Sequence, residues 1–233
     1  MNIKTSREEE ASVLIDKKNI KNEKKLKIEL YEILKRIIDI VVSIIGIIGL
    51  IPLTIIIWIA NILVKDNGPV FFVQERIGKD GKLFKLYKYR SMVVNADDKL
   101  SKYLAENQEA RREYKEYKKL KNDPRITFVG KIIRKLSIDE CPQFINILKG
   151  EMSLVGPRPY LLREKEDMKE NYNEIIKVKP GLTGLWQVNG RSDTTFELRT
   201  SIDKDYVQRR GFILDTKIFI RTFLKVFVKE GAK

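Results

Sequence analysis

The stretch SIDECPQFINILKGEMSLVGPRP, residues 137–159, is the part of the chain around which the rest of the fold is organised. Ser137 and Glu140 stand three residues apart ahead of an apolar run, which is the spacing of a capping box. Pro142 is tolerated only in the first turn of a helix, so the cap is either Ser137 or Asp139. The pattern predicts a short apolar helix with two adjacent carboxylates, Asp139 and Glu140, at its positive end.

The charge of the chain restricts its partners and its chemistry. A formal net charge of +14 over 233 residues points to a polyanion: nucleic acid, an anionic membrane surface or phosphorylated substrates. The chain has one cysteine and no histidine, which excludes disulfides, Cys/His zinc sites and histidine-activated nucleophiles. Cys141 is either a reactive thiol at a helix start or a small buried apolar residue. Acid, base or metal chemistry must therefore use carboxylates.

A long apolar segment runs from Ile37 to Val64 and exceeds the about 20 residues that span a bilayer. Pro52 divides it into two arms, each of which is shorter than the hydrocarbon core of about 30 Å. Two topologies remain: a kinked helix that crosses, or a re-entrant hairpin that turns at Pro52. Basic residues flank both ends of the segment, and charge retained on one side of the membrane favours the hairpin.

Three further segments have clear patterns. Residues 69–73 and 83–90 have the β-branched and aromatic content of strands, with glycines between them, and predict a β-hairpin. The charge-rich residues 96–121 predict a helical segment with a solvated outer face. In residues 211–229 a cation recurs every four positions among apolar residues, the pattern either of an amphipathic helix at a membrane interface or of a helix packed on its own domain.

The conformation of Arg158 is restricted by its neighbours. It stands between two prolines, so its backbone is confined to extended conformations and its guanidinium is presented from a stiff loop, which suits bidentate recognition of phosphate. Arg134 precedes Asp139 closely enough to share a site with it. Paired carboxylates with several cations indicate phosphate chemistry with a divalent metal. Structural ion pairing would use the same residues.

An ordered series of sequence blocks resembles a known family. The blocks are Lys35-Arg36-Ile37-Ile38-Asp39, Gln74-Glu75-Arg76-Ile77-Gly78, Lys88-Tyr89-Arg90-Ser91-Met92, Leu136-Ser137-Ile138-Asp139-Glu140, residues 150–159 and residues 180–191. Together they resemble the monotopic polyprenyl-phosphate phosphoglycosyl transferases, or bacterial sugar transferases, of exopolysaccharide, capsule, O-antigen and glycoprotein pathways. The resemblance runs from about Lys35 to the C-terminus.

The resemblance implies roles for the carboxylates. Asp139 is expected to be the nucleophile that attacks the sugar-bearing phosphorus of a UDP-sugar, releasing UMP and leaving a sugar phosphate on the aspartate. Glu140 is expected to be the ligand of Mg²⁺. Undecaprenyl phosphate would then attack this intermediate and give undecaprenyl-diphospho-sugar. The hexose-transferring branch, with galactose or glucose, is favoured by the residue 96–121 insertion.

The resemblance also implies binding residues. The four phosphate-binding candidates are Lys88, Arg90, Arg134 and Arg158. The weaker candidates for the nucleotide or sugar are Asn189, Gly190 and Arg191. Asp203 matches an acidic position of the family, to which no role is assigned.

The expected fold is α+β and mainly helical: a membrane-associated monotopic domain with a re-entrant membrane helix hairpin, a small β-hairpin and an amphipathic C-terminal helix. Its expected parts are a basic N-terminal arm (residues 1–34), the re-entrant helix (residues 35–65) and a cytoplasmic catalytic domain with interfacial helices (residues 66–233). The expected place is the cytoplasmic face of the bacterial inner membrane, among membrane lipids, and a homodimer is compatible with the sequence.

Two other functions compete with this hypothesis. A membrane-tethered binding protein would use the positive charge to hold nucleic acid or acidic lipid, but no nucleic-acid motif is present, so we expect no nucleic-acid partner. A hydrolase would use the same two carboxylates and differ only in whether water or a lipid phosphate takes the second step.

Overall fold

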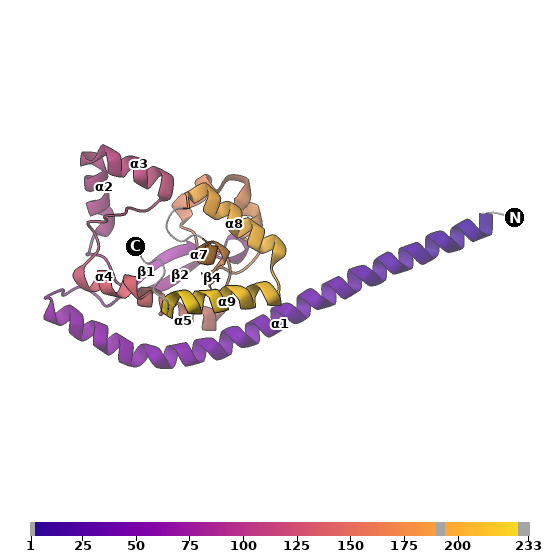
Figure 1. Ribbon diagram of the computed structural model, residues 1–233, viewed down its shortest axis with the longest axis horizontal. Coiled ribbons are helices and arrows are strands. Elements are labelled where there is room, and N and C mark those ends of the chain that lie inside the picture. Colours follow the sequence, from indigo (N-terminus) through magenta and orange to yellow (C-terminus); the bar gives the residue numbers. More distant parts are fainter. Residues whose placement is uncertain (1–2, 190–193, 228–233) are drawn as a thin grey trace. The chain divides into compact units, whose positions relative to one another are not determined.

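The computed structural model describes residues 3–189 and 194–227, and its contacts divide the chain into two units, Met1–Ile38 and Asp39–Lys233. The described residues are mainly helical with two small two-stranded sheets (Figure 1), which confirms the predicted mainly helical α+β class. The helices are α1 (Ile3–Leu63), α2 (Ala96–Glu106), α3 (Gln108–Tyr117), α4 (Phe128–Lys135), α5 (Gln143–Lys149), α6 (Tyr172–Ile175), α7 (Leu185–Asn189), α8 (Phe196–Arg209) and α9 (Phe212–Phe227). The strands are β1 (Phe71–Ile77), β2 (Leu83–Tyr89), β3 (Ser153–Val155) and β4 (Gly181–Thr183), and 3₁₀ turns lie at Lys79–Gly81, Ile138–Glu140, Leu162–Glu164 and Glu166–Asn171.

The apolar segment is part of one continuous helix, α1, which Figure 1 draws as an unbroken ribbon. Pro52 lies inside it, so the predicted hairpin turn at Pro52 is not present and that prediction is corrected. The helix continues because Leu50 and Ile57, on either side of the proline, are buried in the same apolar cluster with Tyr89 of β2. Leu26–Leu63 is long and apolar enough to cross a membrane by length and composition.

A buried carboxylate links this helix to the first short strand of the second sheet. Asp39 is 3% exposed, and its Oδ1 accepts a hydrogen bond from Ser153 Oγ at 3.1 Å and another from the Leu154 amide at 2.8 Å. A carboxylate at the start of an apolar segment is costly unless it is paired in this way. Asp39 therefore fixes where α1 meets β3.

The predicted β-hairpin is confirmed. Strands β1 and β2 pair antiparallel from Phe71 opposite Tyr89 to Ile77 opposite Leu83. The turn between them contains Asp80 at φ 57° and Gly81 at φ 75°. The left-handed conformation there is compatible with glycine and tolerated by aspartate.

A second pair of strands, which the sequence does not predict, joins distant parts of the chain. β3 and β4 run parallel, with Ser153 opposite Gly181 and Val155 opposite Thr183. The backbones approach so closely that a Cβ on Gly181 would lie 2.0 Å from the Gly156 nitrogen. The pair places the loop that carries Arg158 directly beside the segment that follows residue 180.

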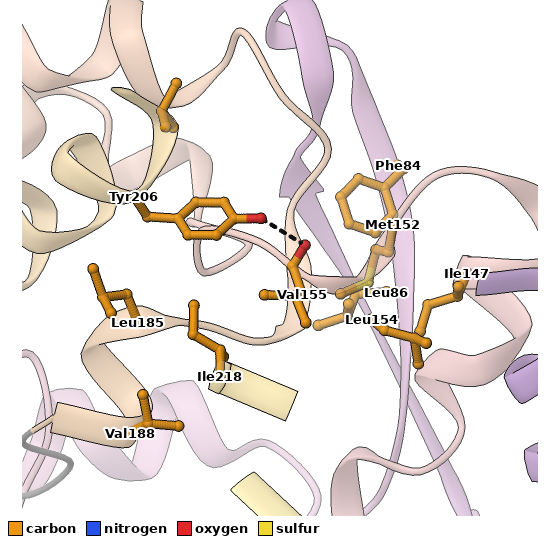
Figure 2. Packing of buried hydrophobic residues seen from close by; sticks show 11 residues of the cluster. Phe84, Leu86, Ile147, Met152, Leu154, Val155, Leu185, Val188, Tyr206 and Ile218 are labelled. Carbon is orange, nitrogen blue, oxygen red and sulfur yellow. Dashed lines mark hydrogen bonds between the residues drawn. The ribbon is translucent and has the colours of Figure 1, made fainter. Parts of the chain in front are cut away.

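The main apolar core lies between this second sheet and the helices around it. It includes Leu86 of β2, Met152 and Leu154 near β3, and Ile218 of α9 (Figure 2). The Tyr206 hydroxyl donates a hydrogen bond to the Val155 carbonyl at 3.3 Å and to Asp215 Oδ1 at 2.8 Å. One face of α9 thus packs on its own domain.

The rest of the described part of α9 exposes large apolar side chains. They are Phe212, Ile213, Phe219, Ile220, Phe223 and Leu224. The predicted amphipathic C-terminal helix is therefore present, with one apolar side in the core and further apolar surface outside it.

The charge-rich segment forms two helices rather than one. α2 and α3 meet at Asn107, whose Oδ1 accepts a hydrogen bond from the Ala110 amide at 2.9 Å and so caps α3. Asparagine is favoured at the N-cap of a helix and disfavoured in its interior, which explains why one helix ends and the next begins at this residue. Leu100, Ala110 and Leu120 form a small core of their own between the two helices.

Two glycines of α1 offer a matched test of its packing. A Cβ on Gly46 would lie 2.5 Å from the ring of Phe144 in α5, whereas a Cβ on Gly49 meets nothing within 4 Å. We expect Gly46→Ala to lower the free energy of unfolding by about 1–3 kcal/mol through overpacking. Gly49→Ala should leave it equal or raise it by up to about 1 kcal/mol through helix propensity. Thermal unfolding of the detergent-purified variants measures both, and equal midpoints would contradict the close α1–α5 contact.

Candidate active site

The two carboxylates lie in a 3₁₀ turn, Ile138–Glu140, between α4 and α5. Ser137 has a left-handed backbone with φ 58° and makes no side-chain cap, and α5 begins only after Pro142. The predicted capping box is therefore wrong. The dyad, as we name Asp139 and Glu140, precedes α5 by one turn instead of forming its first turn.

Lys88 is the nearest described cation to the dyad. Its Nζ lies 2.7 Å from Glu140 Oε1, and both side chains are about a quarter exposed, at 23% and 29%. Lys88 belongs to β2, whose contact with the turn joins residues more than 50 positions apart in sequence. The pair holds Glu140 at the edge of the β-hairpin.

The pKa of Asp139 differs from that of an ordinary aspartate. Burial first, and then the neighbouring charge of Glu140, raise the pKa of this carboxyl to about 6 against the lowering effect of Lys88 and Arg134. A carboxylate that is partly desolvated and lies beside a second carboxylate is a candidate nucleophile or base. At neutral pH it is mostly ionised and poorly solvated.

Arg134 and Arg90 differ in their availability for a ligand. Arg134 is exposed in the last turn of α4 and forms no ion pair with a described residue, and its charge has a lowering effect on the pKa of Asp139. Arg90 is 6% exposed and is held by Asp66 at 3.0 and 2.9 Å and by the carbonyls of Pro69 and Met92. Its donors join the segment before β1, which contains Asp66 and Pro69, to Met92 after β2, so the contacts of Arg90 in the structure are structural, whereas a phosphate contact was predicted.

Arg158 lies in the loop after β3 and is held through its backbone. Its amide donates to Asp203 Oδ2 at 3.1 Å, and the Tyr160 hydroxyl donates to the same oxygen at 2.7 Å. Asp203 is completely buried, and burial raises its pKa to about 7 against the lowering effect of these hydrogen bonds. Asp203 therefore positions the Arg158 loop, a role that the sequence did not assign.

Arg76 is a residue near the site that the site prediction omitted. It is 7% exposed, and its Nη1 donates to the Pro159 carbonyl at 3.0 Å. The charge of Glu140 affects its pKa, which places it near the dyad. The block Gln74-Glu75-Arg76 was a signal for it in the sequence, but nothing there distinguished Arg76 from the other cations of the hairpin.

The weaker nucleotide or sugar candidates are only partly described. Asn189 is at the end of α7, and its Oδ1 accepts a hydrogen bond from Arg221 of α9 at 3.4 Å. Gly190 and Arg191 lie outside the described residues. A cavity of 510 Å³ borders Asn189, Arg209, Lys217 and Arg221, and the dyad does not line it. The structure does not bring Asn189 to the dyad.

The oxygen atoms of the dyad can be compared with the ligands that Mg²⁺ prefers. Among the described residues no group of three or more His, Cys, Asp or Glu side chains could hold a metal ion. Mg²⁺ commonly takes one or two protein carboxylates and completes its shell with water and substrate phosphates. Asp139 and Glu140 fit such a site provided that a phosphate supplies further ligands.

Comparison with known proteins gives a consistent result. The family model described as bacterial sugar transferase matches residues 30–229. Undecaprenyl-phosphate galactose phosphotransferase of Salmonella typhimurium is 45% identical over 199 residues, which cover 85% of this chain and 41% of that protein. UDP-glucose:undecaprenyl-phosphate glucose-1-phosphate transferase of Klebsiella pneumoniae is 38% identical, over 86% of this chain and 41% of that protein.

A shorter relative matches along most of its length. Exopolysaccharide production protein ExoY of Sinorhizobium fredii is 38% identical over 200 residues, which cover 86% of this chain and 88% of that protein. The chain thus spans less than half of the Salmonella and Klebsiella proteins and most of ExoY.

The pKa of Asp139 predicts a pH-dependent effect of its removal. Because this pKa is raised, the ionised carboxylate is less favourable in the folded state than in the unfolded state, and the cost appears as pH rises through about 6. We expect Asp139→Asn to raise the thermal midpoint at pH 8 and to lose this advantage as pH falls toward 5. Asp205→Asn, which removes a surface partner of Arg209, is the control. A constant difference between Asp139→Asn and the unchanged chain from pH 5 to 8 would contradict the buried ionised carboxylate.

Proposed function

The chain belongs to the bacterial sugar transferase family, and from this premise we propose that it transfers a sugar 1-phosphate from a UDP-sugar to undecaprenyl phosphate. The products are undecaprenyl-diphospho-sugar and UMP, and the reaction is the first membrane step of an exopolysaccharide, capsule, O-antigen or glycoprotein glycan. The observation that carries the proposal is the dyad, in which a partly desolvated Asp139 stands beside Glu140 and a lysine.

Asp139 is the nucleophile of the first step. One of its oxygens attacks the phosphorus that carries the sugar, the bond from this phosphorus to the UMP oxygen breaks, and UMP leaves with the electron pair. The raised pKa supports this role because a poorly solvated carboxylate is more reactive than one in water, while remaining largely ionised at neutral pH.

Glu140 and Lys88 hold the charge around the reacting phosphate. Glu140 would bind Mg²⁺, and Lys88, whose Nζ lies 2.7 Å from Glu140 Oε1, would lie beside the ion. The ion, when bound, would neutralise phosphate oxygens on which charge develops. The Lys88 ammonium would donate to a phosphate oxygen of the substrate.

The second step returns the aspartate to its first state. An oxygen of the lipid phosphate attacks the phosphorus held by Asp139, and the bond to the aspartate breaks to give the lipid diphosphate and a free carboxylate. The acceptor and the nucleotide use the same nucleophile in turn, so the kinetics are of the ping-pong type. A galactose or glucose donor is proposed, in agreement with the hexoses in the names of two relatives.

The chain is proposed to lie at the cytoplasmic face of the inner membrane, with an apolar helix that enters the bilayer and does not emerge on its opposite face. From Asp39 to Ile57, α1 contacts the catalytic domain repeatedly, through Ser153, Phe144 and Tyr89. This length corresponds to about 27 Å of helix. A helix held along a domain over that distance supports a monotopic arrangement, because a perpendicular crossing would separate the two.

The first test is the release of UMP by detergent-purified protein with Mg²⁺, a panel of UDP-sugars, and undecaprenyl phosphate present or absent. Lipid-dependent UMP release with a UDP-hexose is the expected result, and UMP formed equally well without lipid would indicate a hydrolase. Asp139→Asn should abolish release, by on the order of 10⁴-fold or more, because the covalent route is lost. Measurable lipid-linked product from this variant would remove the covalent mechanism.

Substitution of Glu140 should change both the pH–rate profile and the dependence of the rate on Mg²⁺ concentration. Because Glu140 raises the pKa of Asp139, Glu140→Gln should lower that pKa and shift the acid limb of the pH–rate profile to lower pH. The rate should fall by at least about tenfold, and the Mg²⁺ concentration for half-maximal activity should rise. The control is Glu174→Gln, a change in α6 that removes the carboxylate paired with Lys177. An unchanged acid limb with an unchanged Mg²⁺ titration would argue against both roles.

A further inference from the structure

Three arginines from separate elements come together around the loop that follows β3. Arg76 comes from β1, Arg158 from the loop itself and Arg199 from α8. The Nε atom of each is buried and has no hydrogen-bond partner within the described part of the chain, and none of the three forms an ion pair with a described carboxylate. Buried cations in this state are costly, so their retention needs a reason.

The three guanidinium groups are close enough to affect one another. Burial first, and then the charge of Arg158, lower the pKa of Arg76 to about 10. Burial and Arg158 act in the same way on Arg199, whose pKa is also about 10. Arg158 therefore interacts with both of the others, and the three form one group of like charges.

The neighbouring carboxylates do not compensate this charge directly. Glu164 raises the pKa of Arg76 and Arg199, but its Oε2 accepts from the Leu161 amide at 2.8 Å. Asp203 accepts from Arg158 and Tyr160 through Oδ2, and its pKa is raised to about 7. Glu140 also acts on Arg76, but its Oε1 is paired with Lys88. Among the described residues, the three arginines therefore lack a carboxylate that is paired with them directly.

The arginines are held in place by contacts that leave donors unused. Arg76 donates through Nη1 to the Pro159 carbonyl and through Nη2 to Gln74 Oε1. Arg199 donates through Nη2 to the Thr194 carbonyl at 3.5 Å and lies over the Trp186 ring, 4.6 Å from its centroid. The Trp186 Nε1 atom is also buried without a partner in the described residues. Guanidinium groups that are fixed in position but not satisfied are suited to an anion with several oxygens.

We propose that Arg76 and Arg199, together with Arg158, form a binding site for a phosphate group of a substrate beside the dyad. Arg158 was already a candidate, whereas Arg76 and Arg199 are new. The proposal rests on the proposed function for the identity of the substrate, but the site itself requires only a phosphate. The effect of Glu140 on the pKa of Arg76 places this site near the reacting carboxylates.

Two substrates carry the required group. One is the diphosphate of the UDP-sugar, and the other is the phosphate of the lipid acceptor. The site recognises phosphate oxygens in either case, and steady-state kinetics separate the two sources. An Arg199 variant should raise KM for the UDP-sugar if the donor binds there, or KM for undecaprenyl phosphate if the acceptor does.

The binding test uses the full-length, detergent-purified chain and inorganic diphosphate as the probe. The variants are Arg199→Gln and Arg199→Lys, and the control is Arg209→Gln, which removes a cation of the same helix that pairs with Asp205. We expect Arg199→Gln to weaken diphosphate binding by about tenfold or more, and Arg199→Lys to weaken it less because the charge is retained. Arg209→Gln should bind within about twofold of the unchanged chain, since it alters only an exposed pair.

The thermal midpoint without diphosphate separates binding from a structural role. Arg199 is buried without an ion pair to a described carboxylate, and its contact with the Trp186 ring does not offset the cost of this burial. Arg199→Gln should therefore keep or raise the midpoint measured without diphosphate, while the stabilisation by diphosphate is lost. Arg76→Gln is a second variant, in which we also expect weaker diphosphate binding and a midpoint that is unchanged or raised. Undiminished diphosphate binding in both variants, or a loss that follows only from a lowered midpoint, would overturn the proposal. Diphosphate binding that depends on Arg199 in a protein without transferase activity would support the site and refute the proposed function.

Discussion

The hydrogen bonds accepted by Asp39 are the constraint on which the positions of the other parts depend. Asp39 is the first residue of the larger unit, and its Oδ1 fixes the backbone of Leu154 in β3. β3 leads within two residues into the loop of Arg158, and its parallel pairing with β4 leaves no room for a side chain at Gly181. The apolar helix, the short strand and the arginine loop are therefore registered against one another before any substrate is present.

The charged groups of the candidate site reduce the stability of the fold, which suggests that they are kept for function. Asp139 is ionised at neutral pH although burial and Glu140 disfavour its charge, and Arg76 and Arg199 remain charged although burial and Arg158 disfavour theirs. Arg76 and Arg199 are not joined to a described carboxylate in an ion pair that would neutralise their charge. Under the proposed function, a substrate that carries phosphates and binds a divalent cation would compensate the charges of both groups, and the cost of holding them would contribute to selectivity for such a substrate.

The sequence predicted the elements whose signals are local, and it missed those that depend on distant contacts. The β-hairpin followed from alternation and glycines, and the dyad was visible as adjacent carboxylates. The turn predicted at Pro52 failed because tertiary packing of Leu50 and Ile57 holds the helix together across the proline. The pairing of β3 with β4 could not be predicted, since three-residue strands leave almost no pattern, and without it the proximity of Arg158 and Arg199 was not visible.

Strand β2 contacts both the apolar helix and the dyad. Successive side chains of a strand point to opposite faces. Lys88 accordingly contacts Glu140 at 2.7 Å, while the hydroxyl of the next residue, Tyr89, lies 2.7 Å from Thr54 Oγ1 of α1. Ile138 and Cys141, on either side of the dyad, pack against the same apolar cluster as Leu50, Ile57 and Tyr89. Because the pairing of β2 with β1 fixes its register, both contacts are kept together and the dyad is held beside the apolar helix, as the proposed reaction between a soluble nucleotide and a lipid phosphate would require.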